Sequence, residues 1–231
     1  MKTIGMIGGM SWESTRLYYE ILNRQVQRRL GGVHSVKALL YSFDFGEMAK
    51  LQSTGRWDDA TRLMCGAGET LARAGADFLI ICCNTMHLMS DDVERAAGIP
   101  LLHIADPLGE KMKSDGVARA GLLGSCFTME DDRIIKKRLA DKFGIETMVP
   151  EKADAAEVDR VIQEEFVRSR FLDSSRIRYR EIMARLVARG AQGIILGCTE
   201  IPLLVQSEDA SVPLYDTTSL HALAAVNVAL S

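Results

Sequence analysis

Two polar motifs, each headed by a cysteine, end two of the most apolar runs of the chain. Cys-Asn-Thr at 83–85 follows the run at 78–82, and Cys-Thr-Glu at 198–200 follows the run at 194–196. A thiol can take or give a proton near neutral pH once its surroundings lower its pKa from about 8.5. Hydroxyl and amide groups beside a thiol can hold a carboxylate or stabilise developing negative charge. The motifs therefore point to thiol chemistry on a small polar molecule.

Composition narrows the class of partner. The chain has 231 residues, 47% hydrophobic and 26% charged, with a formal net charge of −3 and basic and acidic residues mixed along its length. This balance provides no basic surface for nucleic acid or an anionic membrane. No run reaches the roughly 18 to 20 apolar residues of a membrane-spanning helix, and no cationic leader precedes the first apolar run. We expect a cytoplasmic protein whose partner is a small molecule.

Cysteine usage agrees with that compartment. The five cysteines are an odd number and contain no Cys-x-x-Cys pair: Cys65, Cys82, Cys83, Cys126 and Cys198. In a reducing compartment such residues are free thiols, either buried as hydrophobes or reactive. The four histidines lie at scattered spacings that give no zinc signature, so we expect no metal site.

Apolar runs alternate with helix-like segments from one end of the chain to the other. The first run, at 3–9, precedes a helical pattern at 12–30, and the pattern at 57–74 precedes the run that ends in the first cysteine motif. Strands apolar on both faces and separated by helices predict parallel sheets covered on both sides. The fold class is α/β.

The chain also repeats itself once, at an offset of about 115 residues. Gly-Ala at 75–76 begins the run that leads to Cys83, and Gly-Ala at 190–191 begins the run that leads to Cys198. A Pro-Leu pair follows each cysteine motif, at 100–101 and at 213–214. We expect two pseudo-symmetric lobes: residues 1–105 with 210–231 carrying Cys83, and residues 106–209 carrying Cys198.

The repeat places each motif where parallel sheets bind ligands, beyond the carboxyl ends of the strands. We expect the active site in a cleft between the lobes, with one thiol on each side of a small substrate. Cys82 aligns with Gly197 in the repeat, so we expect it to pack beneath the site. In the glycine turn after the first run, Ser11 is expected to cap a helix, and the N–H groups of Gly9 to Ser11 form a cradle for a small anion.

The same residues resemble a known family. IGMIGGMSWEST at the start, CCNTMH in the middle and GCTEI near the end are similar to the cofactor-independent aspartate/glutamate racemases, relatives of hydantoin racemase. The resemblance covers nearly the whole chain and is nearest to enterobacterial-type members, some of which act on several amino acids. It implies two flavodoxin-like lobes, a homodimer, no pyridoxal phosphate or other cofactor, and catalysis by Cys83 and Cys198.

The resemblance also implies which residues hold the substrate. Besides the two cysteines these are Met10, Gln52, Asn84, Thr85, Thr128, Glu165 and Thr199. Gln52 and Thr128 could equally be turn or cap residues. Aspartate-specific relatives carry a basic residue at the position of Glu165, so an acidic group there disfavours a second substrate carboxylate, unless Arg168 or Arg170 compensates.

Two thiols suit racemisation, because a proton must leave one face of Cα and another must return to the opposite face. We therefore predict an amino-acid racemase acting on aspartate, glutamate or a neutral amino acid such as homoserine. One alternative is another cysteine-dependent enzyme of the superfamily, an isomerase or a decarboxylase, which uses one cysteine or a nucleophilic one. A second alternative is a non-catalytic amino-acid-binding protein, which needs neither thiol.

Overall fold

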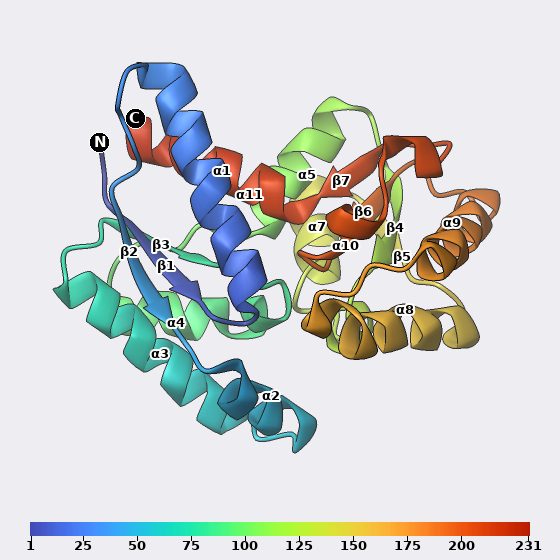
Figure 1. Ribbon diagram of the computed structural model, residues 1–231, viewed down its shortest axis with the longest axis horizontal. Helices are drawn as coiled ribbons and strands as arrows, with labels where there is room; N and C mark the ends of the chain where they lie inside the picture. The colour runs from blue at the N-terminus through green and yellow to red at the C-terminus, as the bar shows by residue number, and fades with distance from the viewer. The chain divides into compact units, whose positions relative to one another are not determined.

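The computed structural model describes residues 1–231 and divides them into two compact units (Figure 1). The first unit contains Met1–Ile104 and Thr218–Ser231, and the second contains Ala105–Thr217. Each unit has its own parallel β-sheet with helices around it, so the prediction of an α/β fold with two parallel sheets is confirmed. No helix is long and apolar enough to cross a membrane.

The first unit is built on a three-stranded parallel sheet of order β2-β1-β3. Its elements are β1 (Ile4–Gly8), α1 (Trp12–Leu30), β2 (Ala38–Ser42), α2 (Phe45–Ser53), α3 (Trp57–Arg73), β3 (Phe78–Ile81), the 3₁₀ helix η1 (Thr85–Met89), α4 (Ser90–Ala97) and most of α11 (Thr217–Leu230). An isolated parallel bridge from Leu79 to Leu101 extends the sheet beyond β3.

Alternation along β1 and β3 divides the core of this unit between the two faces of the sheet. Ile7, Leu79 and Ile81 face a cluster formed by α3 and α4, whereas Ile4, Met6 and Ile80 face a cluster formed by α1 and α11. Figure 1 shows these helix pairs on opposite sides of the sheet. The strands are buried on both faces, which explains their continuous apolar runs.

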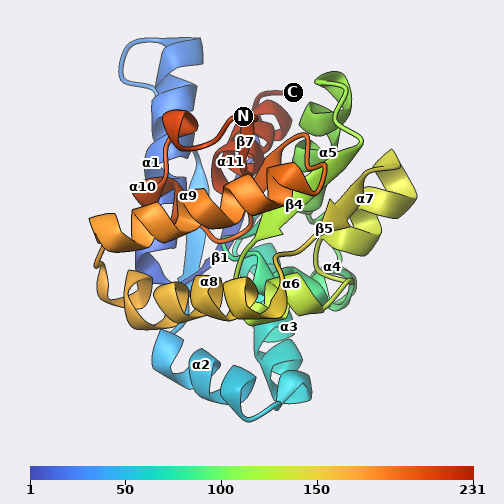
Figure 2. The same cartoon turned by 90° about the vertical axis from the view of Figure 1, so that its right-hand side faces the viewer.

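The second unit is built on a four-stranded parallel sheet of order β5-β4-β6-β7. Its elements are α5 (Ala105–Ser114), β4 (Arg119–Leu123), α6 (Cys126–Glu130), α7 (Lys136–Phe143), β5 (Glu146–Met148), α8 (Lys152–Glu164), the 3₁₀ helix η2 (Phe166–Arg168), α9 (Asp173–Ala188), β6 (Ile194–Leu196), α10 (Ile201–Leu204), the 3₁₀ helix η3 (Ser207–Asp209) and β7 (Leu214–Asp216). Helices α8 and α9 pack together, as Figure 2 shows, and α5 packs against α7.

The hydrogen bonds of the two sheets reproduce the sequence repeat. Equivalent N–H groups donate to equivalent carbonyls: Leu79 to Pro100 (2.8 Å) and Ile194 to Pro213 (2.9 Å), and Cys82 to Ile7 (2.9 Å) and Gly197 to Leu123 (2.6 Å). Gly75 and Gly190 both have positive φ, 96° and 99°. The repeated segments therefore have the same register as well as similar residues.

The last part of the chain differs from expectation. Residues 210–217 were expected in the first lobe, but β7 pairs with β6, with Ile194 opposite Leu214, and so belongs to the second unit. Only α11 returns to the first unit. The second strand ends at Ser42 and α2 begins at Phe45, where the Asp44 side chain accepts from the Gly46 N–H at 2.9 Å.

Candidate active site

In the first unit, strand pairing brings two turns to one edge of the sheet. Strands β1 and β3 are parallel neighbours with Ile7 opposite Ile81, so the turns that follow them leave from the same edge. Cys82 is fully buried in the core, as expected from its place in the repeat. Cys83, one residue further, is half-buried.

Polar side chains predicted around Cys83 lie on the same turn. Asn84 and Thr85 follow Cys83 at the start of η1, and both are almost fully buried. Gln52 extends from α2, and its Nε2 donates to Sδ of Met86 at 3.0 Å, which places it beside the same turn. These residues form what we call the Cys83 site.

Met10 contributes to the Cys83 site from the turn after β1. Its side chain is buried in the apolar cluster against which Cys83 packs. Met10 is therefore part of the apolar packing on which Cys83 rests.

In the glycine turn before α1, one of the three N–H groups of the expected anion cradle is already hydrogen-bonded within the turn. Ser11 caps α1 as predicted, but the Gly9 N–H donates to Oγ1 of Thr15 at 2.8 Å, and that hydroxyl in turn donates to the Ser11 carbonyl at 2.9 Å. Gly9 has φ of 86°, and a Cβ there would come within 2.4 Å of the Phe43 backbone. The turn is therefore closed by internal hydrogen bonds, and the Gly9 N–H is already used.

In the second unit, the corresponding strand end presents Cys198. The thiol is half-buried and donates from Sγ to Oε2 of Glu200 at 3.1 Å. Oγ1 of Thr199 donates to the same carboxylate oxygen at 2.7 Å. Thr199 and Glu200 are buried. One buried carboxylate, that of Glu200, therefore accepts hydrogen bonds from the side chains of both Cys198 and Thr199. We call this group the Cys198 site.

Thr128 lies beneath the Cys198 site. Its side chain is fully buried, and its methyl group is close to both Gly124 and Gly197. A Cβ at Gly197 would be 3.5 Å from Cγ2 of Thr128. The side chain therefore packs under the two strand ends and offers no surface to a ligand.

Glu165 is also buried in the second unit, with its charge already paired. Its carboxylate accepts from Oγ of Ser175 at 2.7 Å and from Nη2 of Arg160 at 3.1 Å. Arg160 also pairs with Glu157 and Glu164, so one guanidinium serves three carboxylates.

Tyr179 connects Glu165 with the thiol of this unit. Burial raises its pKa well above 10, and the neighbouring Cys198 and Glu165 groups raise it further. Its hydroxyl donates to the Val158 carbonyl at 3.1 Å. Tyr179 is therefore a neutral buried phenol whose pKa responds to the charges of both groups.

The remaining thiol near a strand end, Cys126, differs chemically. Its backbone N–H donates to Oδ1 of Asp159 at 2.8 Å, and burial, followed by the charge of Asp159, raises the pKa of its thiol to about 11. It is therefore a neutral thiol at physiological pH. No three His, Cys, Asp or Glu side chains in residues 1–231 gather as a metal ligand set.

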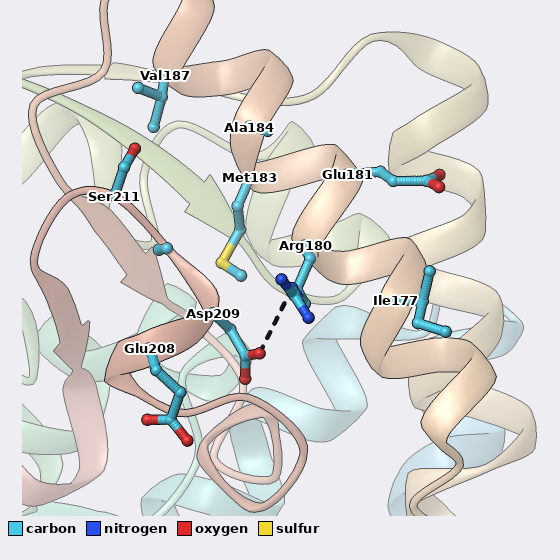
Figure 3. Close-up of a pocket in the computed structure, with 10 residues that line it drawn as sticks. Ile177, Arg180, Glu181, Met183, Ala184, Val187, Glu208, Asp209 and Ser211 are labelled. Carbon is cyan, nitrogen blue, oxygen red and sulfur yellow. Dashed lines mark ion pairs between the residues drawn. The ribbon is translucent and has the colours of Figure 1, made fainter.

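A surface hollow of about 680 Å³ lies between α9 and residues 208–211, and neither cysteine motif lines it (Figure 3). Arg180 and Asp209 face one another there at 3.6 Å. Asp209 already accepts from Nε of Arg176 at 2.7 Å and from the Gln206 N–H at 2.8 Å. Because its buried charge is satisfied, the hollow offers no chemistry comparable with that of the thiols.

Comparison with known proteins identifies the family of the chain. The family described as Asp/Glu/Hydantoin racemase matches residues 7–225 of the chain. The chain belongs to this family. The resemblance inferred from the cysteine motifs is thereby confirmed.

Solved structures of the Asp/Glu/hydantoin racemase family superpose over the full chain. A candidate Asp/Glu racemase from Yersinia pestis is 48% identical, with a TM-score of 0.93 and 100% of both chains covered. An aspartate racemase homologue from Pyrococcus horikoshii is 33% identical, with a TM-score of 0.84 and 100% of both chains covered. Aspartate racemase from Picrophilus torridus is 19% identical with a TM-score of 0.78, and covers 99% of this chain and 94% of its own; it shows the fold.

Three further residues of this racemase-family chain contact or influence the two thiols and were not among the predicted site residues. Glu200 accepts hydrogen bonds from Cys198 and Thr199. Tyr179 lies within α9 and carries no motif that marks it in the sequence. His87 is buried and hydrogen-bonded to the backbone of Cys83. Its place four residues after a reactive thiol was the available signal.

Proposed function

We propose that this protein is a cofactor-independent amino-acid racemase in which Cys83 and Cys198 are the two acid–base groups. The observation that carries the proposal is the equivalence of the two thiols in the repeat. Each follows the buried strand that pairs with the first strand of its unit, each is half-buried, and each is followed by buried polar side chains. A binding protein needs no such duplication, and a decarboxylase or isomerase using one thiol needs only half of it.

The reaction balances with the two thiols alone. One cysteine, as thiolate, removes the proton from Cα and becomes a thiol, while the other, as thiol, gives its proton to the opposite face and becomes a thiolate. The carbanion formed between these steps is stabilised by donors around the α-carboxylate. The N–H groups and side chains that follow each cysteine are suited to this task. Glu200 acts as a positioning residue, because it holds the Cys198 thiol proton.

The charges of the second unit favour substrates without a second carboxylate. Glu165 is a buried carboxylate, and its partner Arg160 is already shared among three carboxylates, so the pair offers no uncompensated positive charge. We therefore infer that neutral amino acids of homoserine size are accepted at least as well as aspartate and glutamate.

Replacement of Glu165 by Gln is expected to raise kcat/KM for aspartate relative to homoserine by about three- to tenfold, since the Arg160 pairing leaves only part of the charge effective. An unchanged ratio would place Glu165 away from the substrate side chain.

Solvent deuterium distinguishes the possible functions. Single L- and D-amino acids are incubated with the protein in D₂O, and both the deuterium content at Cα and the enantiomer ratio are measured. A racemase labels and inverts its ligand, a decarboxylase releases CO₂, and a binding protein leaves the ligand unchanged. Absence of inversion across the full panel would contradict the proposal.

The cofactor and thiol requirements are tested on the same preparation. Activity is expected to survive dialysis against a metal chelator and against hydroxylamine, which traps pyridoxal phosphate, and to be lost with iodoacetamide. Substrate should protect Cys83 and Cys198 from alkylation in peptide mapping. From the family resemblance we also propose a cytoplasmic homodimer, which light scattering coupled to gel filtration would test.

A further inference from the structure

Both ring nitrogens of His87 are bonded to the backbone of the first unit. Nδ1 lies 2.8 Å from the Cys83 carbonyl oxygen, and Nε2 lies 3.2 Å from the backbone nitrogen of Ile104. A carbonyl can only accept and a backbone N–H can only donate, so Nδ1 carries the proton and Nε2 accepts. The two partners therefore define a neutral ring with one tautomer.

The surroundings keep the ring neutral and fixed. His87 is 1% exposed, and the rings of His103 and His221 lie 4.7 and 5.6 Å from it, centroid to centroid. Burial lowers the pKa of His87 well below 6.5, and the neighbouring imidazoles lower it further. His221 is itself bonded, its Nε2 to the Leu102 carbonyl at 2.8 Å and its Nδ1 to the Tyr18 hydroxyl at 2.9 Å.

The two backbone groups that His87 contacts belong to different segments of the first unit. One is the carbonyl of the residue that carries the thiol, and the other is Ile104, the last residue before the chain passes into the second unit. His87 thus joins the turn after β3 to the segment that leaves the unit, and His221 holds the same segment two residues earlier, at Leu102.

We propose that His87 is a positioning residue that fixes the direction of the Cys83 thiol through the hydrogen bond from Nδ1 to the Cys83 carbonyl. The proposal rests on the acid–base role of Cys83. The ring contacts the backbone rather than the thiol, so it transfers no proton. Because a displacement of about 1 Å at a reacting group can cost on the order of a hundredfold in rate, a bond that fixes the Cys83 peptide plane affects kcat more than KM.

Two amide variants separate the two hydrogen bonds. In His87→Asn the amide nitrogen lies near the position of Nδ1 and can still donate to the Cys83 carbonyl. In His87→Gln the amide lies near the position of Nε2 and can still accept from Ile104. His87→Leu removes both bonds. Tyr18→Phe is the matched control, because it removes a buried hydrogen bond from the same cluster without touching either bond of His87.

We expect kcat to fall about 10- to 100-fold in the Gln and Leu variants with little change in KM, to stay within about threefold in the Asn variant, and to be unchanged in Tyr18→Phe despite a lowered Tm. Equal activity of the Asn and Gln variants, or activity that follows Tm across all four proteins, would overturn the proposal. If His87→Leu does not fold, the comparison of His87→Asn with His87→Gln still tests the proposal, because each keeps a different one of the two hydrogen bonds.

A readout independent of racemisation keeps this test separate from the proposed function. Iodoacetamide labelling of Cys83 is measured by peptide mapping relative to Cys198 in the same sample. The ratio should change several-fold in the Gln variant and return to the wild-type value in the Asn variant. If the wild-type protein racemises nothing, the proposed function fails while this ratio still reports whether His87 controls the thiol. A ratio unchanged in every variant would refute the positioning role itself.

Discussion

Replacement of Glu200 by Gln tests the chemistry of the Cys198 site directly. The substitution preserves shape and removes the negative charge that accepts from Sγ of Cys198 at 3.1 Å and from Oγ1 of Thr199 at 2.7 Å. In the wild-type protein the thiol form of Cys198 is stabilised by that bond, and the thiolate form is repelled by the carboxylate. In the variant the repulsion disappears and the neutral amide oxygen accepts from the thiol more weakly, so the thiolate becomes more populated.

The size of this effect follows from the distance. Two unit charges 3.1 Å apart repel by about 5 kcal/mol at an effective dielectric constant of ~20, and by about 1.3 kcal/mol at the value of bulk water. Cys198 is half-buried, so the repulsion lies between these limits. Even the lower limit raises the ratio of thiolate to thiol about ninefold. Nucleophilicity falls as basicity falls, with a Brønsted coefficient near ~0.5, so the alkylation rate should rise about threefold or more.

The assay is competitive labelling with iodoacetamide near pH 7, followed by peptide mapping. Cys83 in the same molecule is the internal reference, because it belongs to the other cysteine motif and its labelling is measured in the same digest. Racemisation should slow, since the Cys198 proton is less firmly held for delivery. L- and D-enantiomers have equal free energies, so kcat/KM must fall equally in both directions, and only the division between kcat and KM can differ. An alkylation ratio identical to that of the wild-type protein would refute the electrostatic reasoning.

Three further predictions follow from other parts of the structure. Cys83→Ser and Cys198→Ser should each abolish racemisation, yet eliminate from opposite enantiomers of a β-substituted alanine; elimination from the same enantiomer by both would contradict opposed thiols. Gly121→Ala places a Cβ within 2.9 Å of core side chains and should lower the free energy of unfolding by about 1 to 3 kcal/mol. At the control position Gly66 a Cβ meets nothing within 4 Å, so Gly66→Ala should leave stability unchanged or raise it, as measured in thermal melts. The lowered pKa of His87 means that the unfolded chain binds its proton first, so stability falls as pH drops below about 6.5, by up to ~1.4 kcal/mol per pH unit; His87→Asn should flatten that slope in urea titrations.

Much of the fold could be predicted from the sequence because the sheets are buried on both faces. Continuous apolar runs marked β1, β3, β4 and β6, and the helical pattern at 12–30 coincides with α1. The boundary of the second unit was placed wrongly, although the repeat contained the answer. Pro-Leu at 213–214 matches Pro-Leu at 100–101, and the latter pairs within its own unit, so β7 should have been assigned to the second sheet.

The sequence predicted the positions of the two cysteines better than the contacts of the residues around them. Position in the sequence located Cys83 and Cys198 at strand ends, because a strand that leaves a buried sheet must end at its edge. It could not show that the Gly9 N–H is taken by Thr15, or that Glu165 is paired with Arg160. Those facts depend on side-chain directions set by tertiary packing, which periodicity does not encode.

The return of α11 to the first unit has a consequence for the order of folding during synthesis. Ala225, Val226 and Ala229 complete the core cluster formed by α1 and one face of the first sheet, and the Lys2 N–H donates to the Ala229 carbonyl at 2.8 Å. The ribosome makes these three residues only after the whole of Ala105–Thr217. At roughly 5 to 20 residues per second, they follow the rest of the first unit by on the order of ten seconds. During that interval the contiguous second unit can begin to fold, while the part of the first unit's core that α11 covers stays exposed and available to chaperones.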